Sequence, residues 1–384
     1  MEARGRRHGA NIMKIIIFGQ SISSSWGNGH ATLWRGLVKA LARRGNRVVF
    51  LERDTPERAE HRDLWDIPGG ELLLYDRWED VAEAAQRHAD EADVAMVTSG
   101  CADGAAASHL VLGSKAQRTV YYDLDTHITL SRSETGERPA YLPPEGLGGF
   151  DTVLSSTGGQ ALEALKTQLG ARFVAPLYAW VDPDLHRPAD PVRRYLGDLC
   201  HLGAWVEDRR AALEALFIEP ARRLGRRRFV LAGGGYPDDA SWGPNIQRVR
   251  HLPPAEHAAF FCSSTLTLNV TRQPLKAMGW CPSVRLFEAA ACGVPVISDE
   301  WEGIGAFFEP GRDILVARET DDVTTALMLP RGHLATLAQR ARSRVLEEHT
   351  AERRVRELRS ILDIKGAAMI DPTFPGCPDC LCWK

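Results

Sequence analysis

Three titratable side chains lie close together in the segment DLDTH, residues 123–127. The segment ends an apolar run that reads as a β-strand, and alternation along that strand would put Asp123 and Asp125 on the same side. The charge of one carboxylate would then raise the pKa of the other, which suits a group that accepts a proton from a hydroxyl. Asp125 is therefore the candidate general base, and His127 and His30 are alternatives. These carboxylates equally suit the capping of a turn or a helix.

Three arginines lie where they could neutralise an anionic group. Arg209 begins an expected helix, Arg272 follows the expected strand 265–270, and Arg285 lies near the start of a later helix. A guanidinium group binds phosphate oxygens through two hydrogen bonds at once, so these side chains suit a diphosphate. Each is equally typical of a solvated protein surface.

Permissive residues in several loops suggest backbone anion sites, because such loops expose N–H groups where a helix starts. Gly27 and Gly29 precede the first expected helix, and Gly203, Gly234 and Thr271 follow strands of the second half. The first loop is not a dinucleotide fingerprint, since seven residues separate it from its strand.

Two other interpretations of the first loop stay open. Glu52 ends the second expected strand, where a nicotinamide-binding protein places the acid that binds a ribose. An NAD(P)-dependent reductase is therefore one alternative. In the other, Gly27 and Gly29 only make a tight turn.

The segment PSVRLFEAAACGVPVI, residues 282–297, combines three features of a nucleotide site. Ser283 can cap a helix, and N–H groups from Val284 onward can hold a diphosphate. Glu288, a turn and a half along, can offer its carboxylate to ribose hydroxyls. An ordinary amphipathic helix with an exposed glutamate is the alternative.

The elements that would position these residues form two repeats of strands and helices. Apolar runs rich in β-branched residues alternate with helical or loop segments, as in a doubly wound parallel sheet. Four prolines between residues 176 and 191 stiffen a connector between the halves. The expected strands are Lys14–Gly19, Arg47–Leu51, Asp93–Ser99, Arg118–Asp125, Asp151–Ser156, Asp198–Trp205, Arg228–Gly235, Val249–Pro254, Thr265–Val270, Val294–Ser298 and Ile314–Ala317, and the expected helices are Ala31–Arg44, Arg209–Leu224, Val284–Cys292 and Ala335–Leu362, the last broken near Thr350.

Composition bounds the class of protein. The chain has 384 residues, and its 47 basic against 50 acidic side chains argue against a nucleic-acid partner. We expect a soluble, cytoplasmic protein, because no apolar run reaches the roughly 18 residues of a spanning helix. Eight cysteines are too few for a disulfide framework. Three of them, Cys377, Cys380 and Cys382, could hold a soft metal or stay unliganded.

Several blocks together resemble the GT-B glycosyltransferases with a family-4-like C-terminal domain, which carry E-x7-E-A-x-A-x-G-x-P-V-I. Residues 288–297 fill the second half of that motif. The blocks SISSSWGNGHA, YDLDT, SVRLFEAAACGVPVISD and WEG are similar to those of the spore-maturation, CgeB-type branch. The similarity runs from about Met13 to about Leu362.

The resemblance implies two Rossmann-like parallel-sheet domains that face a central cleft. It implies transfer of a sugar from a UDP-, GDP- or dTDP-sugar to an acceptor hydroxyl of a small molecule, glycan or protein, with no cofactor and no required metal. Arg209 is then the first choice for neutralising the leaving diphosphate. The expected division is a disordered leader 1–12, an acceptor domain 13–180, a hinge 181–195, a donor domain 196–348, a terminal helix 349–366 that crosses back, and a Cys-rich tail 367–384.

One position departs from the family pattern. Trp280 stands where the first glutamate of the motif would fall, so retention and inversion at the sugar both stay open. The missing carboxylate favours one alternative, a catalytically degenerate protein that only binds sugar nucleotides. A GT-B epimerase or phosphorylase is another alternative.

Overall fold

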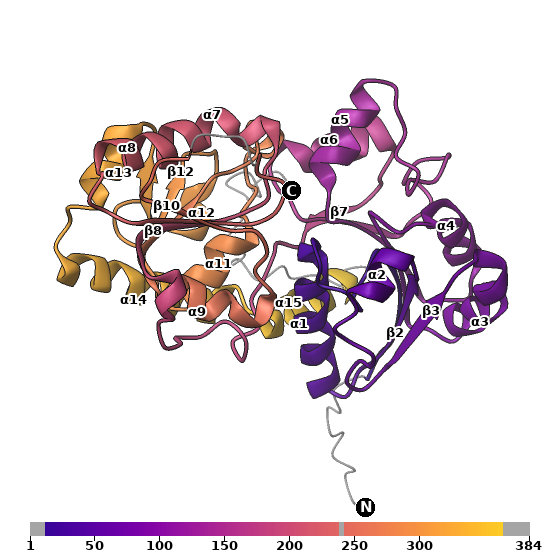
Figure 1. Ribbon diagram of the computed structural model, residues 1–384. Helices are drawn as coiled ribbons and strands as arrows, with labels where there is room; N and C mark the ends of the chain where they lie inside the picture. Colours follow the sequence, from indigo (N-terminus) through magenta and orange to yellow (C-terminus); the bar gives the residue numbers. More distant parts are fainter. Residues whose placement is uncertain (1–11, 238–241, 364–384) are drawn as a thin grey trace, which may run out of the picture.

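The computed structural model describes residues 12–237 and 242–363 and consists of two α/β domains side by side (Figure 1). The expected leader, apart from residue 12, and the cysteine-rich tail lie outside the described residues. Of the helices in the described ranges, none combines the length and apolarity that a membrane crossing needs.

The first domain is built on a seven-stranded, fully parallel sheet in the order β3-β2-β1-β4-β5-β6-β7. Apolar runs such as Ile15–Phe18 are buried on both faces, which explains why they carry no polar alternation. The strands are β1 Lys14–Gly19, β2 Arg47–Arg53, β3 Glu71–Tyr75, β4 Val94–Thr98, β5 Arg118–Asp123, β6 Thr152–Ser155 and β7 Val174–Pro176, and the helices are α1 Gly29–Arg43, α2 Pro56–Glu60, α3 Trp78–Asp90, α4 Gly104–Gly113, α5 Thr126–Glu134 and α6 Gln160–Leu169.

The second domain repeats this plan with six parallel strands in the order β10-β9-β8-β11-β12-β13. Its strands are β8 Gly197–Leu202, β9 Phe229–Ala232, β10 Ile246–Val249, β11 Ser264–Asn269, β12 Val296–Asp299 and β13 Leu315–Ala317. Its helices are α7 Arg210–Leu213, α8 Glu219–Arg223, α9 His257–Cys262, α10 Gln273–Met278, α11 Val284–Ala291, α12 Ile304–Phe307, α13 Thr320–Ala326 and α14 Arg331–Glu348, with short 3₁₀ turns at Arg193–Tyr195, Glu207–Arg209 and Pro254–Glu256. The expected architecture of two parallel-sheet α/β domains is confirmed.

The last helix, α15 Ala351–Asp363, leaves the second domain and packs against α1 of the first (Figure 1). Val181 forms a parallel bridge with Thr350 at the crossing. The buried Arg354 guanidinium donates to the carbonyls of Tyr178 and Ala179 at 2.8 and 3.1 Å. These contacts hold the start of α15 against the segment that leaves the first sheet.

Several expected elements differ from the structure. The expected strand Val249–Pro254 is misplaced, because β10 spans Ile246–Val249. Strand β5 ends at Asp123 rather than Asp125, because α5 begins immediately after. Strand β8 ends at Leu202 rather than Trp205. The expected helix Arg209–Leu224 contains a π-turn at Glu214–Ile218, because Pro220 lacks the N–H that a regular α-helical hydrogen bond needs.

Candidate active site

A cavity of about 180 Å³ lies between the two domains. The loops around it follow the carboxyl ends of β1, β5, β6 and β11, the edge at which open parallel sheets bind ligands. Among the predicted site residues, those that line it are Gly29, His127, Arg209, Thr271, Arg272, Ser283 and Val284. His30, one alternative for the base, lines it too, with the unpredicted Ser156 and Thr157.

The N-terminus of α11 opens on the cavity. Ser283 is the N-cap, and its hydroxyl accepts the N–H of Arg285 at 3.3 Å. Both Ser283 and the first helical residue, Val284, line the cavity. The remaining N–H groups of the first turn and the helix dipole make this end suited to an anion.

Two guanidinium groups lie on the same side of the cavity. Arg272 donates through Nε and Nη2 to Asp208 Oδ2 at 3.0 and 2.9 Å, and its Nη1 lies 3.0 Å from His127 Nε2 of the first domain. Arg209 donates through Nη1 to the carbonyl of Ala204, and within the described chain its Nε has no hydrogen-bond partner. Arg209 therefore keeps donor capacity for a ligand. Burial lowers its pKa.

His127 is a poor candidate for a base in this arrangement. Its ring is buried, and burial together with the charge of Arg272 lowers its pKa to about 4. The neutral ring accepts the Arg272 hydrogen bond and thereby orients that side chain across the domain interface.

The opposite wall carries His30, and its partner Asp125, the predicted base, lies off the cavity wall. His30 lies in the first turn of α1, where the Asn28 side chain caps the His30 N–H at 3.0 Å. His30 Nε2 lies 3.4 Å from Asp125 Oδ1. Burial opposes ionisation of Asp125, but the hydrogen bond and charge of His30 hold its pKa below the ordinary value. A carboxylate with a lowered pKa is a weak base, so Asp125 is better suited to hold His30 than to take a proton itself.

Asp123 and Asp125 do not share a strand face, because only Asp123 lies in β5. Asp125 occupies the N-cap of α5, and its N–H donates to Asp123 Oδ1 at 3.0 Å. Full burial, with the charge of Asp125, raises the pKa of Asp123 to about 7. The sequence predicted that one carboxylate would raise the pKa of the other, with Asp125 as the base. In the structure the raised pKa is that of Asp123, which does not line the cavity.

Four predicted ligand residues of the glycine loops have differing surroundings. Gly27 adopts φ +59° with open space around it. Gly203 lies where a Cβ would come within 2.9 Å of Arg209 Nη1, so its lack of a side chain makes room for that guanidinium. Gly234 is exposed, and its carbonyl accepts the N–H of Trp205. Of the four, Gly29 alone lines the cavity.

Glu288 and Arg285 also lie off the cavity wall. The Glu288 carboxylate is fully buried, and Arg285, His186 and His257 surround it. Burial alone would raise the pKa of Glu288, but the charge of Arg285 and the contacts with His186 and His257 outweigh it, so this pKa lies well below its ordinary value. Contact with a ribose stays a prediction. No sequence spacing pointed to His186 or His257, because residues this far apart meet only in the fold.

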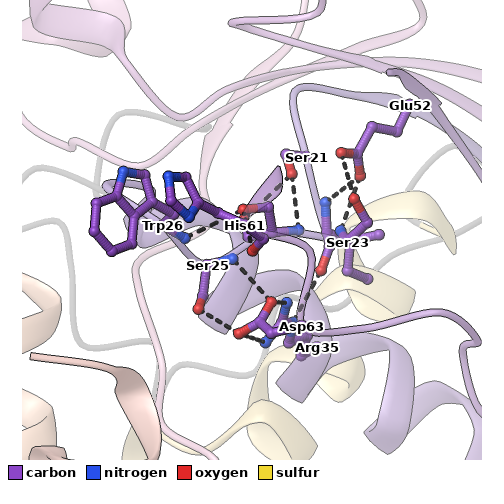
Figure 2. A network of polar contacts seen from close by, with 10 residues as sticks. Ser21, Ser23, Ser25, Trp26, Arg35, Glu52, His61 and Asp63 are labelled. Carbon is purple, nitrogen blue, oxygen red and sulfur yellow. Dashed lines mark hydrogen bonds and ion pairs between the residues drawn. The ribbon is translucent and has the colours of Figure 1, made fainter. Parts of the chain in front are cut away.

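The serine-rich loop after β1 has its own support, which Figure 2 shows. The buried Glu52 carboxylate accepts the N–H groups of Ile22 and Ser23 at 2.7 and 2.9 Å and the Ser23 hydroxyl at 2.7 Å. Both carboxylate oxygens of Glu52 are therefore occupied by groups of the loop. This disfavours the interpretation in which Glu52 binds the ribose of a nicotinamide cofactor. Trp26 stacks on His61, 4.0 Å between ring centroids, and lies equally close to His251 of the second domain.

Trp280 is strained and packed between the domains. It is the one non-glycine residue of the described chain with a positive φ, at 47°. Its carbonyl accepts the N–H of Gly158 from the first domain. A Cβ at Gly159 or Gly303 would lie within 2.5 or 2.6 Å of its ring. Trp280, which stands where the motif E-x7-E has its first glutamate, thus serves as an interdomain contact.

The comparisons with known proteins agree with this geometry. Residues 209–360 match the family described as Glycosyl transferase-like. A search of curated proteins gives no match. The second half of the chain therefore carries a glycosyl transferase-like domain. The two Rossmann-like domains together have the fold of the GT-B glycosyltransferases.

Solved structures share this fold over nearly the whole chain. Sucrose-phosphate synthase from Thermosynechococcus elongatus is 14% identical with a TM-score of 0.66, over 92% of this chain and 99% of that one. HepE from Anabaena, in complex with UDP and glucose, is 14% identical with a TM-score of 0.63, over 92% and 100%. An alpha-glucosyltransferase in complex with UDP and DNA is 13% identical with a TM-score of 0.62, over 91% and 99%.

Proposed function

We propose that this protein transfers a sugar from a nucleotide-diphosphate sugar to an acceptor hydroxyl in the interdomain cavity. One observation carries the proposal: the second domain lines the cavity with cations and a helix N-terminus, and the first domain lines it with His30, paired to Asp125. The first wall suits a leaving diphosphate, and the second suits a hydroxyl that loses a proton.

The donor half of the reaction needs stabilisation of negative charge. When the bond from the sugar to the diphosphate breaks, charge grows on the leaving oxygens. Arg209, Arg272 and the first turn of α11 are the groups placed to neutralise it. We therefore propose that the transfer proceeds without a metal ion. Gly29, the first residue of α1, offers its backbone N–H on the facing wall.

The acceptor half needs a base within reach of the cavity. The imidazole of His30 accepts the proton of the attacking hydroxyl, and the Asp125 carboxylate stabilises the imidazolium that forms. Ser99 donates to Asp125 Oδ2 at 3.4 Å and helps to fix that carboxylate. His127 positions Arg272 in this scheme.

UDP is the first nucleotide to test, because the structures of HepE and of the alpha-glucosyltransferase contain it. We also propose a relationship to the spore-maturation, CgeB-type branch, which rests on the blocks SISSSWGNGHA, YDLDT, SVRLFEAAACGVPVISD and WEG. This relationship is separate from the proposed reaction. If the chain does not belong to that branch, the proposed transfer from a nucleotide-diphosphate sugar is unaffected.

A thermal-shift screen followed by a donor-turnover assay tests the function. Purified protein is mixed with UDP, GDP, dTDP, ADP, their sugar conjugates and NAD(P)H, since a ligand of the folded state raises the melting temperature. We expect a shift with one nucleoside diphosphate and its release from the matching sugar conjugate. A shift without release or transfer would instead support the degenerate binder that Trp280 suggests, and a shift with NAD(P)H alone would support a reductase.

A further inference from the structure

A second polar cluster lies behind α11, away from the cavity. His186 comes from the segment between the sheets, His257 starts α9, and Glu288 lies in α11. They are 2%, 3% and 0% exposed. One ligand atom from each lies within 4.8 Å of the others. None of the three lines the cavity.

The distances within the cluster approach those of a metal site. Glu288 Oε1 lies 3.4 Å from His186 Nε2, and Glu288 Oε2 lies 3.5 Å from His257 Nδ1. A tetrahedral zinc ion with bonds of about 2.1 Å places neighbouring ligand atoms about 3.4 Å apart. Two imidazoles and one carboxylate are, moreover, a ligand set that zinc commonly takes.

Several ligand atoms of the cluster lack a hydrogen bond. Within the described chain, His186 Nδ1, His186 Nε2 and Glu288 Oε1 are buried and have no hydrogen-bond partner. Buried polar atoms in native proteins are nearly always paired, because an unpaired one costs free energy. A cation bound to His186 Nε2 and Glu288 Oε1 would satisfy two of these three atoms.

One charged group competes for the same carboxylate. Arg285 Nη1 lies 2.5 Å from Glu288 Oε2 and 3.4 Å from His257 Nδ1. Its side chain is 27% exposed, so it has a route to solvent. The buried carboxylate can thus be neutralised by the arginine or by a metal ion, and a site of this kind binds metal more tightly when the arginine is removed.

We propose that His186, His257 and Glu288 form a binding site for a zinc ion. The ion would tie the segment that leaves the first domain to α9 and α11. None of the three residues lines the cavity, so we assign the ion a structural role. Glu288 would then bind zinc in place of the ribose contact that the sequence predicts.

Zinc binding is measured on the full chain after chelator treatment, by titration against a chromophoric competitor. The tail thiols are a second potential zinc site, so every protein in the series carries Cys377→Ser, Cys380→Ser and Cys382→Ser. We expect one zinc ion per chain, and a cobalt(II) spectrum with d–d bands but without thiolate charge-transfer bands.

Three further variants decide the assignment. His186→Gln is expected to weaken zinc binding at least about tenfold, because it removes one of three ligands. His333→Gln, at an exposed position of α14, is the matched control and should change nothing. Arg285→Gln is expected to tighten binding about tenfold, because it removes a like charge beside the ion.

Circular dichroism of each zinc-free variant reports whether it folds. Equal zinc affinity in the thiol-free parent and in His186→Gln, or no bound zinc in the parent, would overturn the proposal. If His186→Gln does not fold, Arg285→Gln decides alone, and unchanged zinc affinity in that variant rejects the site.

Discussion

His30 Nε2 and Asp125 Oδ1 are 3.4 Å apart, and they join the first turn of α1, which lines the cavity, to the N-cap of α5. A neutral imidazole that takes up a proton beside a carboxylate gains the attraction of opposite charges. The pair is therefore suited to proton transfer from a hydroxyl, with His30 on the cavity wall and Asp125 behind it.

We predict that His30→Gln lowers kcat by about 10²- to 10³-fold, because it removes the proton acceptor. Asp125→Asn is expected to lower kcat at least about tenfold, because the imidazolium loses its counter-charge. Binding of the nucleoside diphosphate should stay within about twofold in both variants. Steady-state kinetics and calorimetry measure the two effects, and His109→Gln, at an exposed site, is the control. Unchanged kcat in His30→Gln would remove it from the mechanism.

Arg209 provides the sharpest test of the donor wall. We predict that Arg209→Ala weakens binding of the nucleoside diphosphate by about tenfold or more, because it removes a charge-assisted hydrogen bond in a partly desolvated site. Arg222→Ala is the matched control, since that arginine is exposed and pairs with Glu214. The ligand-induced rise in melting temperature should shrink in Arg209→Ala and persist in Arg222→Ala. An equal rise in both would show that Arg209 does not contact the ligand.

Asp123 should make the stability of the protein depend on pH. Burial raises its pKa from 3.8 to about 7, so between these values the folded state holds a proton that the unfolded state has lost. The free energy of unfolding therefore falls as the pH rises through this window and stays low above it. One pKa unit corresponds to about 1.4 kcal/mol, so the loss reaches at most about 4 kcal/mol.

Asp123→Asn keeps the shape of the neutral acid and cannot ionise. We predict that denaturant unfolding at pH 5 and pH 8 gives a smaller difference for this variant than for the wild type. Asp190→Asn, at an exposed position, should retain the wild-type difference. If Asp123→Asn shows the full wild-type difference, ionisation of Asp123 does not contribute.

Much of the fold could be predicted because its sheets are buried on both faces. Continuous apolar runs such as those of β1 and β4 can be recognised in the sequence, and the helix at 284–291 begins after a serine that caps it. Strand β3, ELLLY, was not predicted: it lies at the edge of its sheet, is only half-buried, and lacks a distinctive pattern.

The candidate site was harder to predict than the fold. Sequence reasoning found Arg209, Arg272 and Ser283, because residues after strands collect at one sheet edge. It assigned the base to Asp125, since the strand appeared to continue past Asp123. Where a strand ends depends on the helix that packs after it, and pairing with His30 depends on the contact between α1 and that turn.

The contact of Trp280 with Gly303 leads to the last prediction. Gly303 has φ +88°, and a Cβ there would lie 2.6 Å from the Trp280 ring. We predict that Gly303→Ala lowers the free energy of unfolding by about 2–4 kcal/mol, from overpacking and backbone strain together. Gly305→Ala, two residues on in α12 with nothing within 4 Å of its Cβ, should be neutral or stabilising by up to about 1 kcal/mol.

A double variant separates the two causes of that loss. Trp280→Ala with Gly303→Ala removes the clash but keeps the strain at φ +88°, so the effect of Gly303→Ala should shrink in the Trp280→Ala background. Denaturant unfolding of the four proteins in this cycle gives the coupling free energy. A coupling free energy of zero would mean that the Trp280 ring moves aside at no cost. Trp280 would then not be the rigid interdomain contact that its position between glycines of both domains indicates.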